Sequence, residues 1–342
     1  MRIRTMIGSA IASAAILLMP GRGLHAQPQY VMNFGSVAPE GTPWSDQLEG
    51  IQQRVESDSN GRVRIRLFLS GALGSEIEMV RYVARGERLQ GGGFSTGAIS
   101  QALEIPLLSI PELPYLFQNV SEADAILDGV MLEPVQEALA EEGLVLGAWA
   151  ENGWRSFATI GGPARSPAEL SAFRMRCQEN PIHVDMYEAL GATPVAKPVS
   201  ETLAALNTGI VNGFDNTPLF SLAAGWMGPV THYTVSKHIY QPAGVVYSSA
   251  FMDSLPADLR TLVIGNPQAE AEQGRTAVRQ LQRELMAAIR DMGTTVVRLD
   301  NSQKLAFLSA TRVVHTNFIN QNPSIATEYS MITEALAEIR GQ

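Results

Sequence analysis

The pattern of hydrophobic and polar positions in residues 166–218 predicts a unit of three strands and the helices that connect them. Hydrophobic residues alternate with arginines over 173–177, which is typical of a strand. Ile182 and Met186 then recur at helical spacing behind Pro181, a residue that suits the first turn of a helix. The predicted elements are a helix that begins at 166, strands over 173–177, 193–197 and 210–214, and helices over 181–190 and 201–207, the last capped by Ser200.

A second unit with the same order of elements is predicted near the start of the chain. Its elements are strands over 30–35, 62–69 and 89–94, and helices that begin at 43 and extend over 75–85. Two such units predict an α/β, two-lobed, periplasmic-binding-protein-like fold, in which the lobes face each other across a cleft. We expect each lobe to contain a mixed sheet flanked by helices.

The remaining segments predict how the two lobes are connected. The predicted elements are proline-punctuated extended segments over 106–117, a helix over 121–142, crossover strands over 144–150 and 239–248, a helix that begins at 256, and an uninterrupted helix over 268–292. A helix of about 25 residues spans roughly 37 Å and would lie along both lobes. We therefore assign residues 27–152 and 241–281 to lobe I, and residues 153–240 and 282–342 to lobe II.

Polar residues follow two strands of the second unit. Strands joined by a helical crossover run parallel, so residues 176–178 and 214–216 are expected at the same edge of the sheet. Open α/β sheets bind ligands at this carboxyl edge. The guanidinium of Arg176 and the amide of Asn216 would together hold a carboxylate there.

The first 26 residues have the features of a secretory signal peptide, with Arg2 and Arg4 ahead of an apolar segment over 6–19. We expect export to the periplasm, with an uncleaved membrane anchor as the alternative. Loss of residues 1–26 removes three arginines and no acidic residue, so the formal net charge falls from −9 to −12. A chain this acidic is not expected to bind nucleic acid or an anionic surface. Cys177 is the only cysteine, which excludes an intramolecular disulfide.

Residues 93–97 match the G-x-S-x-G motif that carries the nucleophile of α/β-hydrolases. The glycine run before Ser95 and the proline at 106 leave neither a strong apolar strand nor a long helix around it. We therefore expect Ser95 to be a hydrogen-bonding group, and a secreted serine hydrolase is the alternative. The histidines lack zinc-site spacings, and no phosphate-binding loop or dinucleotide-binding motif is present. The sequence thus predicts no metal and no cofactor.

The order of seven short motifs resembles the solute-binding proteins of TRAP (tripartite ATP-independent periplasmic) transporters, the dicarboxylate-binding type. The motifs are residues 70–74, 113–117, 152–155, 170–176, 191–194, 200–206 and 208–218. The resemblance implies a monomeric binding protein, not an enzyme, that closes on a small organic acid. Such a protein delivers the acid to a permease with a small and a large membrane subunit. A binding protein for an ATP-driven transporter or a sensor kinase is the alternative within the same fold.

The resemblance also implies which residues bind the acid. The carboxylate-clamping arginine of the family corresponds to Arg176, the second ligand-facing arginine to Arg155, and the pocket asparagine to Asn216. The other predicted ligand-binding residues are Gln178, Phe214, Asp215, Trp154, Ser95 and Phe94. The chain departs from the family pattern at Asn212, usually aspartate, at 214–215, usually Gln-Glu, and at Gln178, usually proline. Phe214 and Gln178 would allow a larger or partly apolar acid.

Overall fold

The computed structural model describes residues 28–342, so the predicted signal peptide lies outside the described residues. The strands are β1 (Tyr30–Ser36), β2 (Val63–Phe68), β3 (Gly91–Ser95), β4 (Leu144–Thr159), β5 (Arg174–Cys177), β6 (Thr193–Ala196), β7 (Gly213–Asn216), β8 (His232–Ser248) and β9 (Thr295–Arg298). The helices of the first half are α1 (Pro43–Asp58), α2 (Glu76–Ala84), α3 (Thr96–Leu103), η1 (Pro106–Glu112), α4 (Val120–Asp128) and α5 (Leu132–Glu141). The later helices are α6 (Pro167–Leu170), α7 (Pro181–Ala189), α8 (Val199–Asn207), α9 (Pro218–Ala223), α10 (Ser249–Ser254), α11 (Ala257–Ile264), α12 (Pro267–Gln280), α13 (Gln282–Asp291), α14 (Asn301–Gln321), η2 (Pro323–Ile325) and α15 (Ala326–Arg340).

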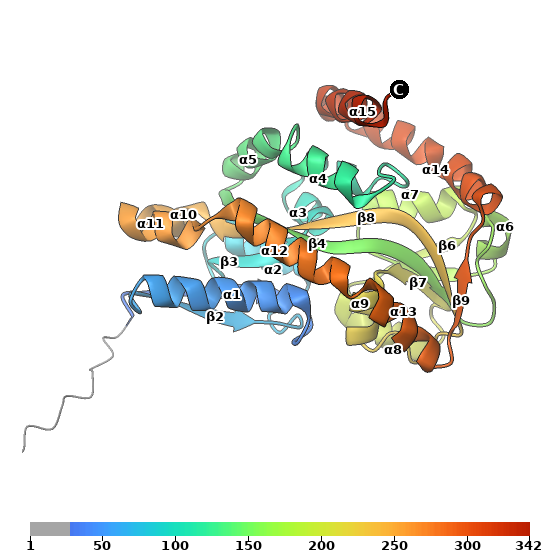
Figure 1. Ribbon diagram of the computed structural model, residues 1–342, viewed down its shortest axis with the longest axis horizontal. Coiled ribbons are helices and arrows are strands. Elements are labelled where there is room, and N and C mark those ends of the chain that lie inside the picture. Colours follow the sequence, from blue (N-terminus) through green and yellow to red (C-terminus); the bar gives the residue numbers. More distant parts are fainter. Residues whose placement is uncertain (1–27) are drawn as a thin grey trace, which may run out of the picture.

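The described strands form one sheet in the order β2-β1-β3-β8-β4-β7-β5-β6, and β9 pairs with β8. In one half β1 runs parallel to β2 and β3, and in the other half β5 runs parallel to β6 and β7. The long strands β4 and β8 pair antiparallel and are shared by both halves. Each half therefore combines parallel and antiparallel pairs, which confirms the predicted two-lobed α/β fold (Figure 1).

The pairing of β4 with β8 is interrupted by register shifts, two of which flank Arg155. Gly153 lies at one of them with φ +102°, a conformation that other residues rarely adopt. Such bulges bend a strand and re-aim its side chains. The side chains of Asn152 and Arg155 both reach Gln241 at the junction of the two halves.

The predicted long helix is two helices, α12 and α13, that meet at Leu281 and lie end to end (Figure 1); α12 packs on β4, and α13 packs against α9 and β9. Leu281 keeps nearly helical dihedral angles, so the joint is a small break rather than a loop. The predicted boundary between residues 281 and 282 coincides with this joint. The division into lobes by residue ranges stays a prediction.

Four other predictions about elements are wrong. Residues 121–142 form two helices because the chain breaks at Gly129, and residues 106–112 form a 3-10 helix rather than an extended segment. β7 begins at Gly213, whereas Ile210 is 52% exposed and belongs to no strand. The helix predicted over 201–207 with Ser200 as its cap begins two residues earlier, at Val199, behind Pro198.

Side-chain caps fix the helices that start beside the sheet edge. Ser75 accepts a hydrogen bond from the Glu78 amide at the start of α2, and Ser95 does the same for Ala98 at the start of α3. Asn180 caps α7 directly after β5. These caps place the first turns of three helices around the end of β5. None of the helices among residues 28–342 is long and apolar enough to cross a membrane.

Candidate functional site

Arg176 is a buried guanidinium near the carboxyl end of β5, and 2% of the residue is exposed. Its Nε and Nη2 donate to the carbonyl oxygen of Lys197, and its charge lies 5.1 Å from the centre of the Trp226 ring. Among the described residues no carboxylate lies within 4.0 Å of it. Burial and the nearby Arg155 lower the pKa of Arg176 to about 10. Among residues 28–342, Arg176 is therefore a buried cation with no carboxylate in direct contact.

A cavity of about 20 Å³ lies beside Arg176. Its walls come from both halves of the molecule: Glu76, Ile77, Ala98, Arg176, Gln178, Glu179, Pro198 and Val199. Gln178 Nε2 donates to Ser95 Oγ at 2.9 Å and so links the two halves across the cavity. The space suits about one water molecule. An organic anion would reach Arg176 only after the two halves separate.

Glu76 faces Arg176 across this cavity, and sequence reasoning missed it. Its two carboxylate oxygens accept hydrogen bonds from the amide and the hydroxyl of Ser95, at 2.6 and 3.1 Å. Burial raises the pKa of Glu76 to about 7, although the hydrogen bonds from Ser95 oppose the shift. The sequence predicted a helix over 75–85, but nothing in it distinguished Glu76 from Glu78.

Glu112 is a second carboxylate that sequence reasoning missed, and it joins the two halves. Oε1 accepts from the Gly97 amide at 2.7 Å and from Thr96 Oγ1 at 3.1 Å. Oε2 contacts His183 Nε2 at 2.8 Å and accepts from Gln241 Nε2 at 2.9 Å. Burial opposes ionisation of Glu112, but the contact with His183 outweighs it and lowers the pKa of the carboxyl. Its charge is thus satisfied within the protein.

Arg155 is as buried as Arg176, but its charge is paired. Its Nε donates to Asp215 Oδ2 at 2.5 Å, its Nη2 to the Asp215 carbonyl at 2.6 Å, and its Nη1 to Gln241 Oε1 at 2.8 Å. Tyr187 donates to the other oxygen of Asp215, and His238 lies 3.3 Å away. Burial opposes ionisation of Asp215, but Arg155 and His238 outweigh it and lower its pKa well below the usual range. Contact between Arg155 and a ligand stays a prediction.

Asn216 ends β7, next to the strand that carries Arg176. Its Oδ1 accepts from Asn152 Nδ2 at 3.3 Å, and the same Nδ2 donates to Gln241 Oε1 at 2.6 Å. Thr217 Oγ1 donates to Asn152 Oδ1 at 3.1 Å. The structure therefore places Asn216 in a buried amide network at the junction of the halves.

The other predicted ligand-binding residues lie in three different environments. Phe94 and Phe214 are fully buried. Phe214 packs edge-on against Trp226, with 5.3 Å between the ring centres, and the Arg176 guanidinium lies over the Trp226 ring. Trp154 is half-buried and lines two hollows away from the Arg176 cavity. Ser95 Oγ contacts Glu76, Gln178 and the Ala98 amide. No histidine among the described residues hydrogen-bonds to it, so the structure does not form the serine–histidine pair of a serine hydrolase.

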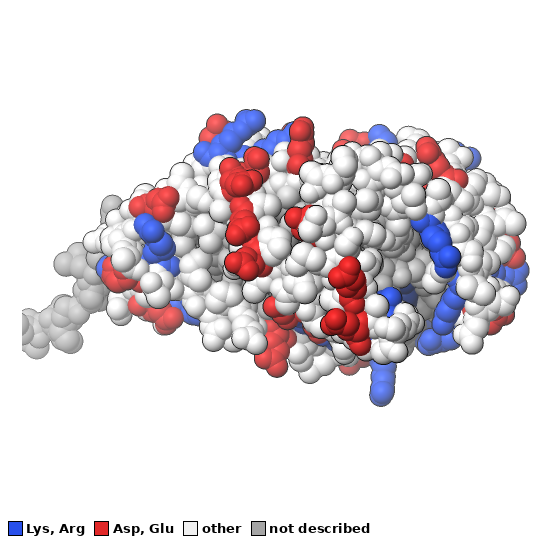
Figure 2. Space-filling model, turned by 90° about the horizontal axis from the view of Figure 1, so that it is seen from above, with Lys and Arg blue, Asp and Glu red and all other residues white. Residues whose placement is uncertain are grey.

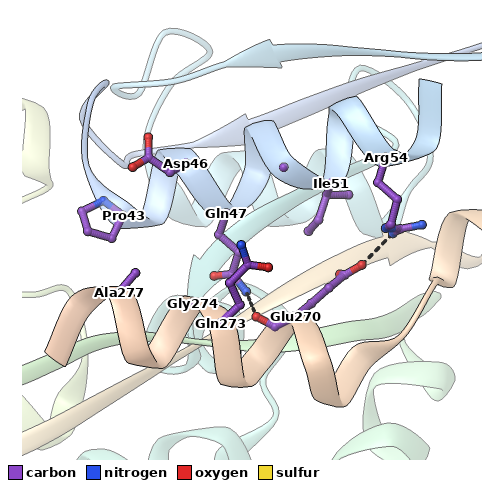
Figure 3. Close-up of a pocket in the computed structure, with 10 residues that line it drawn as sticks. Pro43, Asp46, Gln47, Ile51, Arg54, Glu270, Gln273, Gly274 and Ala277 are labelled. Carbon is purple, nitrogen blue, oxygen red and sulfur yellow. Dashed lines mark hydrogen bonds and ion pairs between the residues drawn. The ribbon is translucent and has the colours of Figure 1, made fainter. Parts of the chain in front are cut away.

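A different hollow of about 280 Å³ lies between α1 and α12 (Figure 3). Arg54 and Glu270 project into it and form an ion pair at 2.7 Å, and Gln47 donates to the Glu270 carbonyl. Arg54 is the one cation among the described residues that line this hollow, and its pairing with Glu270 leaves no unpaired cation there for an organic acid. The Arg176 cavity is the better candidate site.

Comparisons with known proteins found a family model, relatives and solved structures that match most of the chain. The family described as "Bacterial extracellular solute-binding protein, family 7" (DctP) matches residues 34–322. A "Solute-binding protein" of Verminephrobacter eiseniae is 30% identical over 281 residues, which cover 82% of each chain. A TRAP periplasmic solute-binding protein from Sulfitobacter, solved with bound β-D-galacturonate, is 23% identical with a TM-score of 0.84, covering 88% of this chain and 99% of its own. A sugar acid binding protein from Advenella mimigardefordensis, solved with galactonate, is 20% identical with a TM-score of 0.84, covering 90% of this chain and 99% of its own.

Proposed function

Because the chain belongs to the bacterial extracellular solute-binding protein family 7 (DctP), we propose that it binds a small organic acid between its halves through Arg176. Family membership confirms the class of protein predicted from the sequence, a TRAP-type solute-binding protein rather than an enzyme. The finer assignment depends on the residues around the Arg176 cavity.

The unpaired charge of Arg176 carries the proposal. A buried guanidinium without an anion is unfavourable, and closure on a carboxylate replaces its lost hydration with a matched partner. The planar fork of arginine presents two parallel N–H groups to the two oxygens of a carboxylate. The contact of Arg176 with the Lys197 carbonyl and the stacking over Trp226 hold the fork in place. A carboxylate is thus the complement of this site.

The charges around the cavity favour an acid with one carboxylate and several hydroxyl groups. Only one unpaired cation lines the cavity, and the carboxyl of Glu76 faces it. A second ligand carboxylate would be repelled by Glu76 when this side chain is ionised. Ligand hydroxyl groups would instead donate to Glu76 and exchange hydrogen bonds with Ser95 and Gln178. Sugar acids, such as the galacturonate and galactonate bound by the solved relatives, have this chemistry.

Delivery to a membrane permease is the proposed fate of the bound acid. The small cavity and the Gln178–Ser95 hydrogen bond require the halves to open before an acid of this size can enter or leave. A TRAP permease in the membrane, with the binding protein in the periplasm, matches the family. The acid would then be released when docking holds the halves apart.

A thermal-shift panel tests the proposal. The protein is heated with D-galacturonate, D-glucuronate, D-galactonate, succinate or malate, in parallel with the Arg176→Gln variant. We expect at least one sugar acid to raise the melting temperature of the wild type by mass action and to leave Arg176→Gln unchanged. A dicarboxylate that stabilises more than every sugar acid would overturn the ligand class. A shift that persists in Arg176→Gln would overturn the site.

A further inference from the structure

A second concave region of the surface differs from the rest of this acidic protein. It consists of two adjoining hollows of about 410 and 660 Å³ between β8, β9, α13 and α14, which share Trp154, Val235, Lys237 and Arg298. We call it the basic groove. Five cations line it: Lys237, Arg283, Arg290, Arg298 and Lys304. No aspartate or glutamate is among the described residues that line it.

The cations of the basic groove have no acidic partners. Within the described chain, none of the five has a carboxylate within 4.0 Å, whereas Arg275, Arg279 and Arg340 elsewhere in the molecule all form ion pairs. Figure 2 shows basic side chains gathered around a hollow toward the right of that view, with acidic groups nearer the middle. Partial burial, together with Lys304 and Arg298, lowers the pKa of Lys237. The groove is therefore a concentrated positive field without an internal counter-charge.

Lys237 occupies an unusual backbone conformation at the centre of the groove. Its φ is +47°, a region that side-chain-bearing residues rarely adopt, and its amide donates to Ser156 Oγ at 3.2 Å. This arrangement places Lys237 Nζ 6.0 Å from the centre of the Trp154 ring. An aromatic surface thus lies beside Lys237, the cation that β8 contributes to the groove.

We propose that the basic groove is a second binding site, for a small organic anion that carries two or more negative charges on a flat or apolar body. Its larger hollow has the volume of a small-molecule site, about 300–1,000 Å³. Lys237, Arg298 and Lys304 would pair with the charges of the anion, and its flat body would pack on Trp154. The chemistry differs from that of the Arg176 cavity, where one cation faces a carboxyl group. The two sites are formed by different side chains.

Pyranine, a flat aromatic trisulfonate whose fluorescence is easily followed, is the probe. It is titrated into the protein by fluorescence anisotropy at low salt and at about 0.15 M salt, where exposed charges are partly screened. We expect saturable binding of one molecule per chain. Lys237→Gln and Arg298→Gln should each weaken it by about threefold to tenfold, and the double variant by more. Arg64→Gln removes the same charge from an exposed position on β2 and should leave the affinity for pyranine unchanged.

Two further variants keep the test decisive. Lys304→Gln removes a cation from α14 and does not touch the strained backbone at Lys237, so it serves if Lys237→Gln fails to fold. Arg176→Gln should bind pyranine as the wild type does, since the proposed groove does not include Arg176. Equal losses in Arg64→Gln and the groove variants, or loss of binding in Arg176→Gln, would overturn the proposal. Binding that never saturates would overturn it as well.

Discussion

Arg155 and Arg176 are two buried guanidiniums with opposite electrostatic surroundings. They are exposed by 1% and 2%, and they lie on β4 and β5, the two strands that flank β7. Arg155 is paired with Asp215 and has Gln241 as a further partner, whereas Arg176 has only a carbonyl oxygen and the face of Trp226. Burial alone therefore does not distinguish a structural arginine from a binding one. We expect the lack of a carboxylate partner among the described residues to be what distinguishes a binding arginine.

The same contrast separates the two carboxylates that face these arginines. Glu112 is held by four hydrogen-bond partners, and its pKa is lowered. Glu76 has one partner residue, Ser95, and its pKa is raised to about 7. The carboxyl group at the joint between the halves, Glu112, thus has more hydrogen-bond partners than the carboxyl group at the cavity, Glu76. A ligand can supply the hydrogen bonds or the opposite charge that such weakly paired groups lack.

The largest effect on stability is expected at the paired arginine. Arg155→Met leaves Asp215 as a buried charge without its main partner and should lower the free energy of unfolding by about 3–5 kcal/mol. Urea denaturation followed by circular dichroism measures it. Arg165→Met, which breaks an exposed ion pair with Glu169, is the control and should change little. Equal losses in the two variants would mean that the Arg155–Asp215 pair does not organise the core.

A methyl group at Gly97 tests the joint between the halves. A Cβ there would lie 2.6 Å from Glu112 Oε1 and 2.7 Å from Asn180 Nδ2, so Gly97→Ala should lower the free energy of unfolding by about 1–3 kcal/mol. Gly50→Ala, on the exposed face of α1 with no atom within 4 Å of the new Cβ, should be neutral or stabilising. Urea denaturation compares the two, and a neutral Gly97→Ala would contradict the close approach.

The pH dependence of stability tests the weakly paired carboxyl of Glu76. Between its ordinary pKa and about 7, the folded state keeps a proton that the unfolded state has lost. The free energy of unfolding should therefore fall as the pH rises through this window. Glu76→Gln removes that fall, so the variant should be more stable than the wild type at pH 8, by roughly 1–3 kcal/mol, and the difference should shrink toward pH 5.

Glu78, on the same helix, is the matched control for that experiment, because its pKa is shifted in the opposite direction. Hydrogen bonds from the backbone and side chain of Ser75 lower the pKa of Glu78, so its contribution is present above the ordinary carboxyl pKa and is lost as the pH falls. Glu78→Gln should thus be less stable than the wild type at pH 8 and not at low pH. Parallel slopes for the Glu76 and Glu78 variants would contradict the raised pKa of Glu76.

Much of the fold could be predicted because its signals are local. The alternating strand over 173–177 and the helix behind Pro181 were predicted to within a few residues. The failures also have local causes. Gly129 stops a helix whose hydrophobic spacing continues across it, and Leu281 breaks a helix that contains no proline. The single sheet shared by both halves could not be predicted, because strand order is not encoded in periodicity.

The site could be predicted only in part, for a different reason. Arg176 and Asn216 stand out because each ends or nearly ends a strand, and parallel pairing brings β5 and β7 together. Glu76 accepts a hydrogen bond from Ser95, 19 positions away, and Glu112 accepts one from Gly97, 15 positions away. No rule of sequence spacing predicts contacts of this kind. Whether a buried arginine is paired depends on such distant contacts. Sequence alone could therefore name both arginines, but it could not tell which of them is compensated.

Two measurements on Arg176→Gln test the central claim most directly. One is calorimetric titration with the sugar acid chosen by the thermal-shift panel, and the other is urea denaturation without ligand. Arg174→Gln, two residues earlier and exposed on the same strand, is the control. Arg176→Gln should bind about 30-fold to several thousand-fold more weakly, a loss of ~2–5 kcal/mol, while the unliganded variant is at least as stable as the wild type. An affinity within about threefold of the wild type would contradict the claim that Arg176 binds the carboxylate of the ligand. A loss of binding matched by a loss of stability would contradict it as well.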